Sequence, residues 1–280
     1  MNVSIRRACR DDLPGILSVE GKSTPGLRYL GPVFDEFVGD NVGEFSVAEI
    51  DGEIVGAAKF TVLPDRTAWL EALRVPPEHQ GKGIGKRFYE RFFLLAGARN
   101  IKVMRMYTNI GNVTSKGLAE RFGFTLAGTF RGMSLMLPAE LTVTGGERFV
   151  RITDGARGAE LLSAQRRAHQ GFVIMNRTFY EVTPALGAVW AKEGKLFEEP
   201  HTGSLLALGA RFMPETSLHV AVMGGDKASG LCFARWLAGE RRVSKMQYMI
   251  PASDTETQAF LAEQGFVPDS YDCIVMERRL

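Results

Sequence analysis

Apolar and polar residues alternate in several short runs along the first 110 residues, which is the pattern of half-buried β-strands. Two of these runs, 44–50 and 53–63, are joined by the pair Asp51-Gly52. Asp-Gly between alternating runs is a strong hairpin signal, because both residues tolerate the positive φ angles of a tight turn. We therefore predict an antiparallel hairpin here. The other strands predicted in this half are residues 3–6, 67–75 and 101–107.

Helices are predicted where the apolar spacing changes from two residues to three and four. Ile84, Phe88, Phe92 and Leu95 recur at this spacing, so they share one face of a helix that runs to about Arg99. Shorter helices are predicted from Asp11-Asp12 onward, over 33–38 and over 116–122, with the glycine-rich residues 21–31 as a mobile connection between the first two.

The second half of the chain repeats the element pattern of the first. The segments 118–124 and 260–266 both end a short helix in Gly-Phe, at the same distance past the preceding strand. Pro138 to Gly146, with a proline and a Gly-Gly pair, has the composition of a linker. We therefore predict two tandem domains, residues 1–138 and 147–280, the second a diverged copy of the first. The alternative is an unrelated second domain.

The stretch from Trp69 to Lys86 joins a strand to a helix through a basic, glycine-rich turn. Gly81, Gly83 and Gly85 let the backbone approach a ligand closely. The unpaired N–H groups and positive dipole end of the following helix then face that ligand. Neither the GxxxxGK[ST] loop of nucleotide hydrolases nor the dinucleotide fingerprint GxGxxG fits this spacing. The stretch is therefore predicted to bind the phosphates of another kind of ligand.

Two motifs at the right order and separation resemble the GNAT superfamily, the GCN5-related N-acetyltransferases. They are Gln80-x-x-Gly83-x-Gly85 and Asn112-x-x-Ser115-x-x-Leu118-Ala119-x-x-x-Gly123-Phe124. The resemblance implies an α/β GNAT fold, with a mixed, mainly antiparallel central sheet flanked by helices, and acetyl-CoA as cosubstrate. It also implies that strand backbone groups bind pantetheine and that a β-bulge amide polarises the thioester carbonyl. The CoA-binding positions that it implies are Leu73, Arg74, Val75, Gln80, Gly81, Lys82, Gly83, Ile84, Gly85, Lys86 and Asn112.

Direct attack of an amine on the thioester, the usual route in the family, needs a base for the amine's proton. Glu71 is the candidate, because it interrupts an otherwise apolar strand and shares a face with Leu73 by the period of two. A structural ion pair of Glu71 with Arg74 or Arg105 is the alternative.

The leaving thiolate needs a proton donor. In the family a tyrosine of the second motif often supplies it, and in this sequence that position is Ala119. Tyr107 and Ser115 are the nearby candidates, and solvent is a further one. The departure at Ala119 also suits an alternative function, a regulatory module that binds acyl-CoA without turnover.

The second half lacks the phosphate motif. At the equivalent position it has Met223-Gly224-Gly225-Asp226-Lys227, in which Asp226 places a negative charge where phosphates would sit, and Asp254 falls at the position of Asn112. We therefore expect one acetyl-CoA per chain, bound by the first domain, with the second domain shaping or covering the acceptor site.

Composition and charge narrow the partners. A net charge of +2 without a basic run disfavours nucleic acid. No run is long enough to span a bilayer and the N-terminus has no signal core, so we expect a cytoplasmic protein with no membrane partner. The three cysteines, Cys9, Cys232 and Cys273, and the four histidines lack metal-ligand spacing, so no metal and no disulfide framework are expected.

The sequence as a whole predicts an N-acetyltransferase that acts on a small-molecule amine, as a monomer or a homodimer. It does not specify the acceptor. Residues 21–37 and 175–201 are the variable parts expected to set it.

Overall fold

The computed structural model describes residues 3–24, 26–138 and 148–280. The chain divides into two compact units. Unit 1 comprises Met1–Thr108, Asn112–Ala127 and Met276–Leu280, and unit 2 comprises Asn109–Gly111 and Gly128–Val275. Apart from Pro138, the predicted linker from Pro138 to Gly146 lies outside the described residues.

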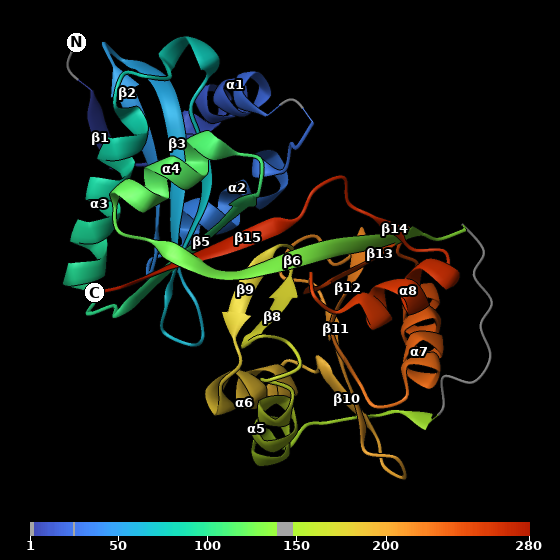
Figure 1. The fold of residues 1–280 in the computed structure, drawn as a ribbon. Helices are drawn as coiled ribbons and strands as arrows, with labels where there is room; N and C mark the ends of the chain where they lie inside the picture. Colours follow the sequence, from blue (N-terminus) through green and yellow to red (C-terminus); the bar gives the residue numbers. More distant parts are fainter. Residues whose placement is uncertain (1–2, 25, 139–147) are drawn as a thin grey trace. The chain divides into compact units, whose positions relative to one another are not determined.

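Unit 1 is built on a mixed, mainly antiparallel sheet with the strand order β1-β2-β3-β4-β5-β15 (Figure 1). Strands β4 and β5 are parallel, whereas β1–β2, β2–β3 and β3–β4 are antiparallel pairs. The strands are β1 (Ser4–Arg7), β2 (Glu44–Ile50), β3 (Glu53–Val62), β4 (Ala68–Arg74), β5 (Val103–Asn109), the start of β6 (Thr125–Met136) and the end of β15 (Cys273–Arg279). The helices are α1 (Leu13–Ser23), α2 (Leu30–Gly39), α3 (Ile84–Ala98) and α4 (Val113–Arg121), with 3-10 turns η1 (Arg10–Asp12) and η2 (Pro77–His79).

Helices cover the two faces of this sheet, and β3 shows which face is which. Phe60 points to α3, where its ring lies 6.0 Å from that of Phe92. Its neighbour Lys59 points to the other face, where its ammonium binds the Asp40 carboxylate at the end of α2 and lies 5.6 Å from the centre of the Phe37 ring. From Gly56 to Thr61, even-numbered residues of β3 therefore face α3, and odd-numbered ones face α2.

The predicted hairpin between β2 and β3 is confirmed. Asp51 and Gly52 have φ angles of 50° and 83°, as a two-residue turn of the I′ type requires. The predicted connection over residues 21–31 is too long, because α1 continues to Ser23 and α2 already begins at Leu30. The reason is the buried carboxylate of Glu20, which accepts hydrogen bonds of 2.9 Å from the backbone N–H groups of Tyr29 and Leu30 and so fixes the start of α2.

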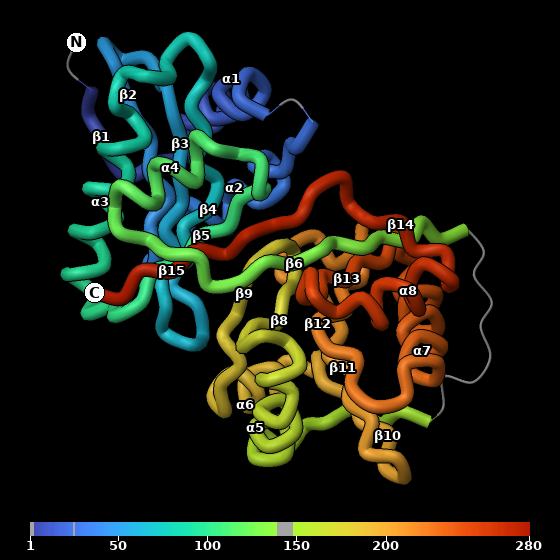
Figure 2. Tube along the Cα trace, viewed as in Figure 1, coloured from blue at the N-terminus to red at the C-terminus, as the bar shows by residue number. Residues whose placement is uncertain are grey.

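The last strand of the sequence, β15, ends in unit 1 and lies next to β5 in the sheet (Figure 2). The backbone N–H of Leu280 donates to the carbonyl of Lys102 at 2.9 Å. Arg105 of β5 donates from Nε to the Glu277 carboxylate at 2.8 Å. Unit 1 is thus completed by residues from the far end of the sequence.

Apart from the hairpin β8–β9 between its first two helices, unit 2 repeats the order of unit 1: a strand, two helices, three strands, a helix, a strand and a helix. Its sheet has the order β6-β13-β12-β11-β10-β7, with β14 also paired to β6 and a separate hairpin β8–β9. As in unit 1, the pair on either side of the long helix, β12–β13, is parallel. The predicted fold class, a mixed and mainly antiparallel sheet flanked by helices in two tandem copies, is confirmed. The elements are β7 (Val150–Arg151), α5 (Gly155–Ala164), β8 (Phe172–Met175), β9 (Thr178–Glu181), α6 (Pro184–Lys192), β10 (Leu196–Glu199), β11 (Ser204–Gly209), β12 (Ser217–Gly224), α7 (Lys227–Glu240), β13 (Lys245–Pro251), α8 (Thr255–Glu263) and β14 (Val267–Pro268).

Candidate active site

The glycine-rich turn after β4 leads directly into the N-terminus of α3. Gly81 and Gly83 have φ angles of 75° and 78°, in the left-handed region that favours glycine. A Cβ at either position would meet no atom within 4 Å, so the constraint is on the dihedral angle and the surface beside the loop is open. Gly83 is the N-cap residue, and no side chain caps α3. The first N–H groups of this helix therefore remain available to an anion.

Side chains around the turn add to its positive character. Lys82, Lys86 and Arg87 are exposed. Gln80 is exposed as well, and it donates from Nε2 to the carbonyl of Val75 at 3.0 Å, which closes the loop. The side chain of Ile84 is buried, so this predicted CoA-binding residue can offer a ligand only its backbone.

A β-bulge interrupts β4 just before this loop. Opposite β3, Glu71 pairs with Lys59 and Arg74 with Ala57, so three residue steps on β4 match two on β3. Ala72 has a φ of 56°, which is unusual for a residue with a Cβ. The extra residue reverses the alternation beyond it.

The bulge corrects the predicted side-chain pattern of this strand. Trp69, Glu71 and Arg74 lie opposite Thr61, Lys59 and Ala57, which alternate along one face of β3. Residues directly opposite in an antiparallel pair project to the same face. The side chain on the face of Glu71 is therefore that of Arg74, and the prediction that Glu71 shares its face with Leu73 is wrong.

Strands β4 and β5 separate beyond the bulge. Their ladder covers Ala68 to Leu70 on β4, opposite Met104 to Met106, while β4 continues to Arg74 and β5 to Asn109. The backbone of the bulged segment consequently lies on an edge that does not belong to this ladder. An extended ligand can add to such an edge through main-chain hydrogen bonds.

The candidate base and one candidate acid lie on the same face of the sheet. Glu71 is buried and its Oε1 accepts a hydrogen bond of 2.6 Å from the Thr61 hydroxyl. The ring of Tyr107 stacks on Trp69, with centroids 5.9 Å apart and planes inclined by 2°. The alternative ion pair between Glu71 and Arg74 does not form, because no carboxylate of the described residues lies within 4.0 Å of the Arg74 guanidinium.

The other two predicted residues belong to α4, which packs beside α3. Asn112 is the N-cap of α4 and its Oδ1 accepts a 3.0 Å hydrogen bond from the backbone N–H of Ser115. The Asn112 side chain therefore has only its amide nitrogen free of this cap for another partner. Ala119, at the family's tyrosine position, is completely buried and carries no proton donor.

The equivalent turn of unit 2 is closed by its own side chain. Asp226 caps α7, with its Oδ1 accepting from the backbone N–H groups of Ala228 at 3.0 Å and Ser229 at 3.4 Å. Its Oδ2 also accepts from the Ser229 hydroxyl at 2.6 Å. These bonds hold the pKa of Asp226 below its usual value, so the carboxylate is ionised at neutral pH. Asp254 caps α8 in the same way, at the position of Asn112.

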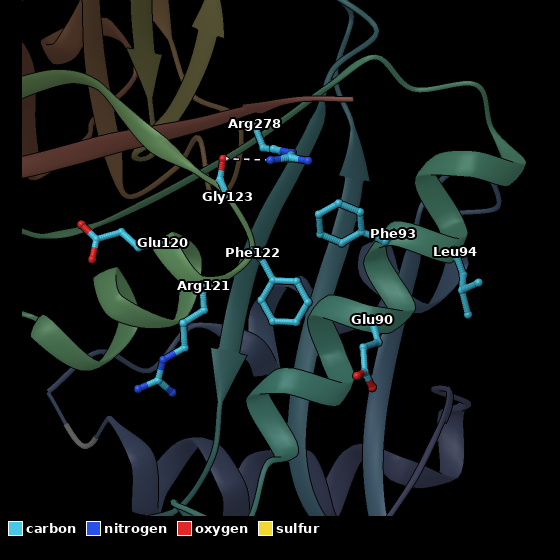
Figure 3. A pocket seen from close by; sticks show the side chains of 8 residues that line it. All are labelled: Glu90, Phe93, Leu94, Glu120, Arg121, Phe122, Gly123 and Arg278. Atoms are coloured by element: carbon cyan, nitrogen blue, oxygen red, sulfur yellow. Dashed lines mark hydrogen bonds between the residues drawn. The ribbon is translucent and has the colours of Figure 1, made fainter.

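A pocket of about 740 Å³ opens elsewhere in unit 1, between the later turns of α3 and the end of α4 (Figure 3). Phe93 and Phe122 form its apolar part, and Arg278 donates to the carbonyl of Gly123 at its rim. It contains none of the residues predicted for catalysis or CoA binding. The candidate site therefore remains the bulged strand and its loop, apart from this groove.

Sequence reasoning missed two features of the site, the position of the bulge and the direction of the Arg74 side chain. The run Glu-Ala-Leu-Arg contains no glycine that would signal a bulge. Within the described residues, no cluster of three or more histidine, cysteine or acidic side chains is arranged to hold a metal ion. Nor does the described part of the chain contain a helix long and apolar enough to cross a membrane.

Comparison with known proteins agrees with this geometry. Residues 8–124 match the model of the Acetyltransferase (GNAT) family. No curated protein matches the sequence. A GCN5-related N-acetyltransferase from Sphaerobacter thermophilus superposes with a TM-score of 0.67 at 14% identity, covering 99% of this chain and 95% of that one. One from Kribbella flavida gives 0.56 at 17% identity, covering 100% and 71%.

A tandem GNAT protein from the clavulanic acid biosynthesis pathway is similar over its whole length. It superposes with a TM-score of 0.61 at 14% identity and covers 99% of this chain and 98% of that one. The fold and the family match over residues 8–124 both support an acyltransferase. Residues 8–124 thus resemble the GNAT acetyltransferases in sequence, and the chain as a whole has a fold similar to that of the tandem GNAT protein.

Proposed function

We propose that the protein is an acetyl-CoA-dependent N-acetyltransferase, in which a small-molecule amine attacks the thioester directly. One observation carries this proposal: the bulge at Ala72, the separation of β4 from β5, and the uncapped start of α3 follow one another along a single run of residues. An open strand edge next to an anion-binding helix end suits a ligand that has an amide-rich arm attached to a pyrophosphate.

Acetyl-CoA would be held mainly by backbone groups. The N–H groups of the turn from Gln80 to Lys86 bind the pyrophosphate, and Lys82 and Lys86 contribute charge. The backbone of Leu73, Arg74 and Val75 binds the pantetheine arm and offers a donor to the carbonyl oxygen. A donor aimed at the developing oxyanion typically contributes roughly 3 kcal/mol to lowering the barrier.

The side chains on the face of Glu71 supply the proton transfers. The amine nitrogen forms a bond to the acetyl carbon, the C–S bond breaks, and Glu71 takes the proton that the nitrogen loses. The thiolate receives a proton from Tyr107 or Ser115, or from water. Tyr107 has the better position of the two, since it lies on the face that carries Glu71, through its stacking on Trp69.

The two halves divide this work unequally. We assign catalysis to residues 1–138 and a degenerate GNAT-like role to residues 147–280, with one acetyl-CoA per chain. Support comes from Asp226, whose carboxylate occupies the N–H groups at the start of α7 that phosphate would need. A bound phosphate would also meet its negative charge.

Thiol release from acetyl-CoA, measured across a panel of amines, tests the proposal. Gly83→Val should raise the Kd for acetyl-CoA at least tenfold, because valine at a φ of 78° is strained and displaces the loop. Gly97→Ala is the matched control, since a Cβ at Gly97 in the same helix meets no atom within 4 Å. If acetyl-CoA binds but no amine causes thiol release, the alternative function, a regulatory module that binds acyl-CoA without turnover, would be favoured.

Glu71→Gln tests the base. The variant should lower kcat by roughly 10²- to 10⁴-fold at neutral pH, and the acidic limb of the pH–rate profile should disappear. An unchanged profile would remove Glu71 from the mechanism and leave the acetyl-CoA site intact.

A further inference from the structure

We propose that the acceptor is a small amine that also carries a carboxylate, and that the Arg74 side chain binds this carboxylate. The inference rests on the proposed N-acetyltransferase function and names the class of substrate for that site. It makes Arg74 a specificity-determining residue through its side chain, in addition to the backbone role assigned to it above.

The register of β4 brings Arg74 to the acceptor side. Because of the bulge, Arg74 projects to the same face as Glu71, and their partners on β3, Ala57 and Lys59, are only two residues apart. At 3.2–3.4 Å per residue, the two side chains leave the strand about 7 Å apart. This spacing suits a ligand whose amine lies near Glu71 while a carboxylate a few bonds away reaches Arg74.

The Arg74 guanidinium is held in place without a carboxylate partner. Nη1 donates to the carbonyl of Leu73 at 3.3 Å, and the guanidinium carbon lies 5.8 Å from the centre of the Tyr29 ring. Nε is shielded from solvent and has no hydrogen-bond partner among the described residues. The cation is thus positioned by packing while its donors are only partly used.

The other half-buried or buried arginines of unit 1 find their partners in two ways. Arg7, Arg99 and Arg278 donate to backbone carbonyls, whereas three others pair with carboxylates. Arg6 pairs with Asp12 at 2.7 Å, Arg91 with Glu44 at 2.8 Å. The third, Arg105, pairs with both Asp65 and Glu277. Each of these pairs brings a half-buried or buried guanidinium together with a protein carboxylate. Arg74, which is half-buried, has no carboxylate partner within the described part of the chain and lies on the face of Glu71, so its counter-ion is to be sought in the acceptor.

The chemistry of the site favours a carboxylate over other groups. A guanidinium presents a planar fork of donors that matches carboxylate geometry. An unpaired cation also disfavours an acceptor that brings only a protonated amine, because like charges repel in a partly desolvated site. A carboxylate on the acceptor removes this repulsion and satisfies the unused donors. Small amino acids have both groups at the required separation.

The experiment compares matched acceptors that differ only at the carboxyl group: an amino acid, its primary amide, and the corresponding decarboxylated amine. The kcat/KM for thiol release is measured for wild type, Arg74→Gln and Arg74→Lys, with Arg10→Gln as the control at an exposed arginine. The Kd for acetyl-CoA is measured in parallel to show that each variant is folded and binds cosubstrate.

Wild type should prefer the acid to its amide and amine by roughly 10- to 100-fold, the usual effect of a charge-assisted hydrogen bond. Arg74→Gln should lower kcat/KM for the acid by that factor and leave the other two acceptors within about threefold. Arg74→Lys should lie between the two, because it keeps the charge and loses the fork. Arg10→Gln should behave as wild type.

Two results would overturn the inference without touching the proposed function: a wild-type preference for the amine lacking a carboxylate, or an equal loss for all three acceptors in Arg74→Gln. Acetyl-CoA binding without thiol release for any acceptor in wild type would instead refute the proposed function, and the inference would fall with it.

Discussion

The buried guanidinium of Arg105 offers the sharpest test of how unit 1 is held together. It contacts Asp65 from the β3–β4 turn at 3.0 Å and Glu277 of β15 at 2.8 Å, and the exposed fraction is 1% for the Arg105 and Asp65 side chains and 15% for that of Glu277. In Arg105→Met the methionine fills much of the space, but Asp65 loses this cation and Glu277 keeps its pair with Arg279 at 3.0 Å. Removing one partner from a buried ion pair typically costs roughly 3–5 kcal/mol. Against a typical total of about 5–15 kcal/mol, this is a large fraction of the stability.

Urea unfolding of the full chain, followed by hydrogen exchange resolved to peptides, measures this cost and where it falls. Protection should decrease in peptides of β4, β5 and β15. Adding Asp65→Asn to Arg105→Met should recover part of the lost stability, because it removes the buried negative charge that Arg105 had balanced. Arg121→Gln, at an exposed arginine of α4, is the control and should change stability by less than about 0.5 kcal/mol. A loss below about 1 kcal/mol in Arg105→Met would refute the reasoning.

Two further predictions concern unit 2. Burial lowers the pKa of His169 and of His219 to about 4, so below pH 6.5 the unfolded chain takes up these protons first. The free energy of unfolding should therefore fall as the pH drops from 6.5 towards 4, by roughly 2 kcal/mol per histidine between pH 7 and 5. In urea titrations at several pH values, His219→Gln should remove the part of this pH dependence that His219 contributes. An identical pH dependence in the variant would contradict the assignment. Gly187→Ala should destabilise the α5–α6 pair by roughly 1–3 kcal/mol, because its Cβ would lie 2.4 Å from the carbonyl oxygen of Gly158. Thermal unfolding measures this, with Gly97→Ala, where the space is open, as the comparison.

Local signals in the sequence were sufficient for much of the fold. The Asp51-Gly52 turn and the helical spacing from Ile84 onward were predicted because turn chemistry and periodicity act over a few residues. The repeat was found through a shared element order and a shared Gly-Phe ending. The length of the connection near Gly21 was misjudged, since Glu20 fixes the start of α2 through a tertiary contact that no local pattern records.

The candidate site was predictable in its loop and less so in its strand. Glycine spacing indicates the phosphate turn because glycine alone adopts the left-handed angles of Gly81 and Gly83 without strain. The bulge at Ala72 depends on how β4 pairs with β3, which no local pattern specifies. The direction of the Arg74 side chain follows from that register. Strict alternation along β4 instead predicted that Leu73 would share the face of Glu71. The sequence also predicted that Asp226 would disfavour phosphate in unit 2, because a carboxylate at a helix start competes with any anionic ligand.

The return of β15 to unit 1 has a consequence for the order in which the protein is made. Apart from residues 109–111, unit 1 is continuous up to Ala127, yet it also needs Met276–Leu280, which begin 149 residues later. At roughly 5–20 residues per second, about 7–30 s pass before that strand exists. Throughout this interval β5 lacks one of its two neighbours, β15, and Arg105 lacks its partner Glu277. A nascent chain in this state exposes an unpaired strand edge, so the ribosome-bound protein should be a substrate for chaperones long after its glycine-rich loop has been translated.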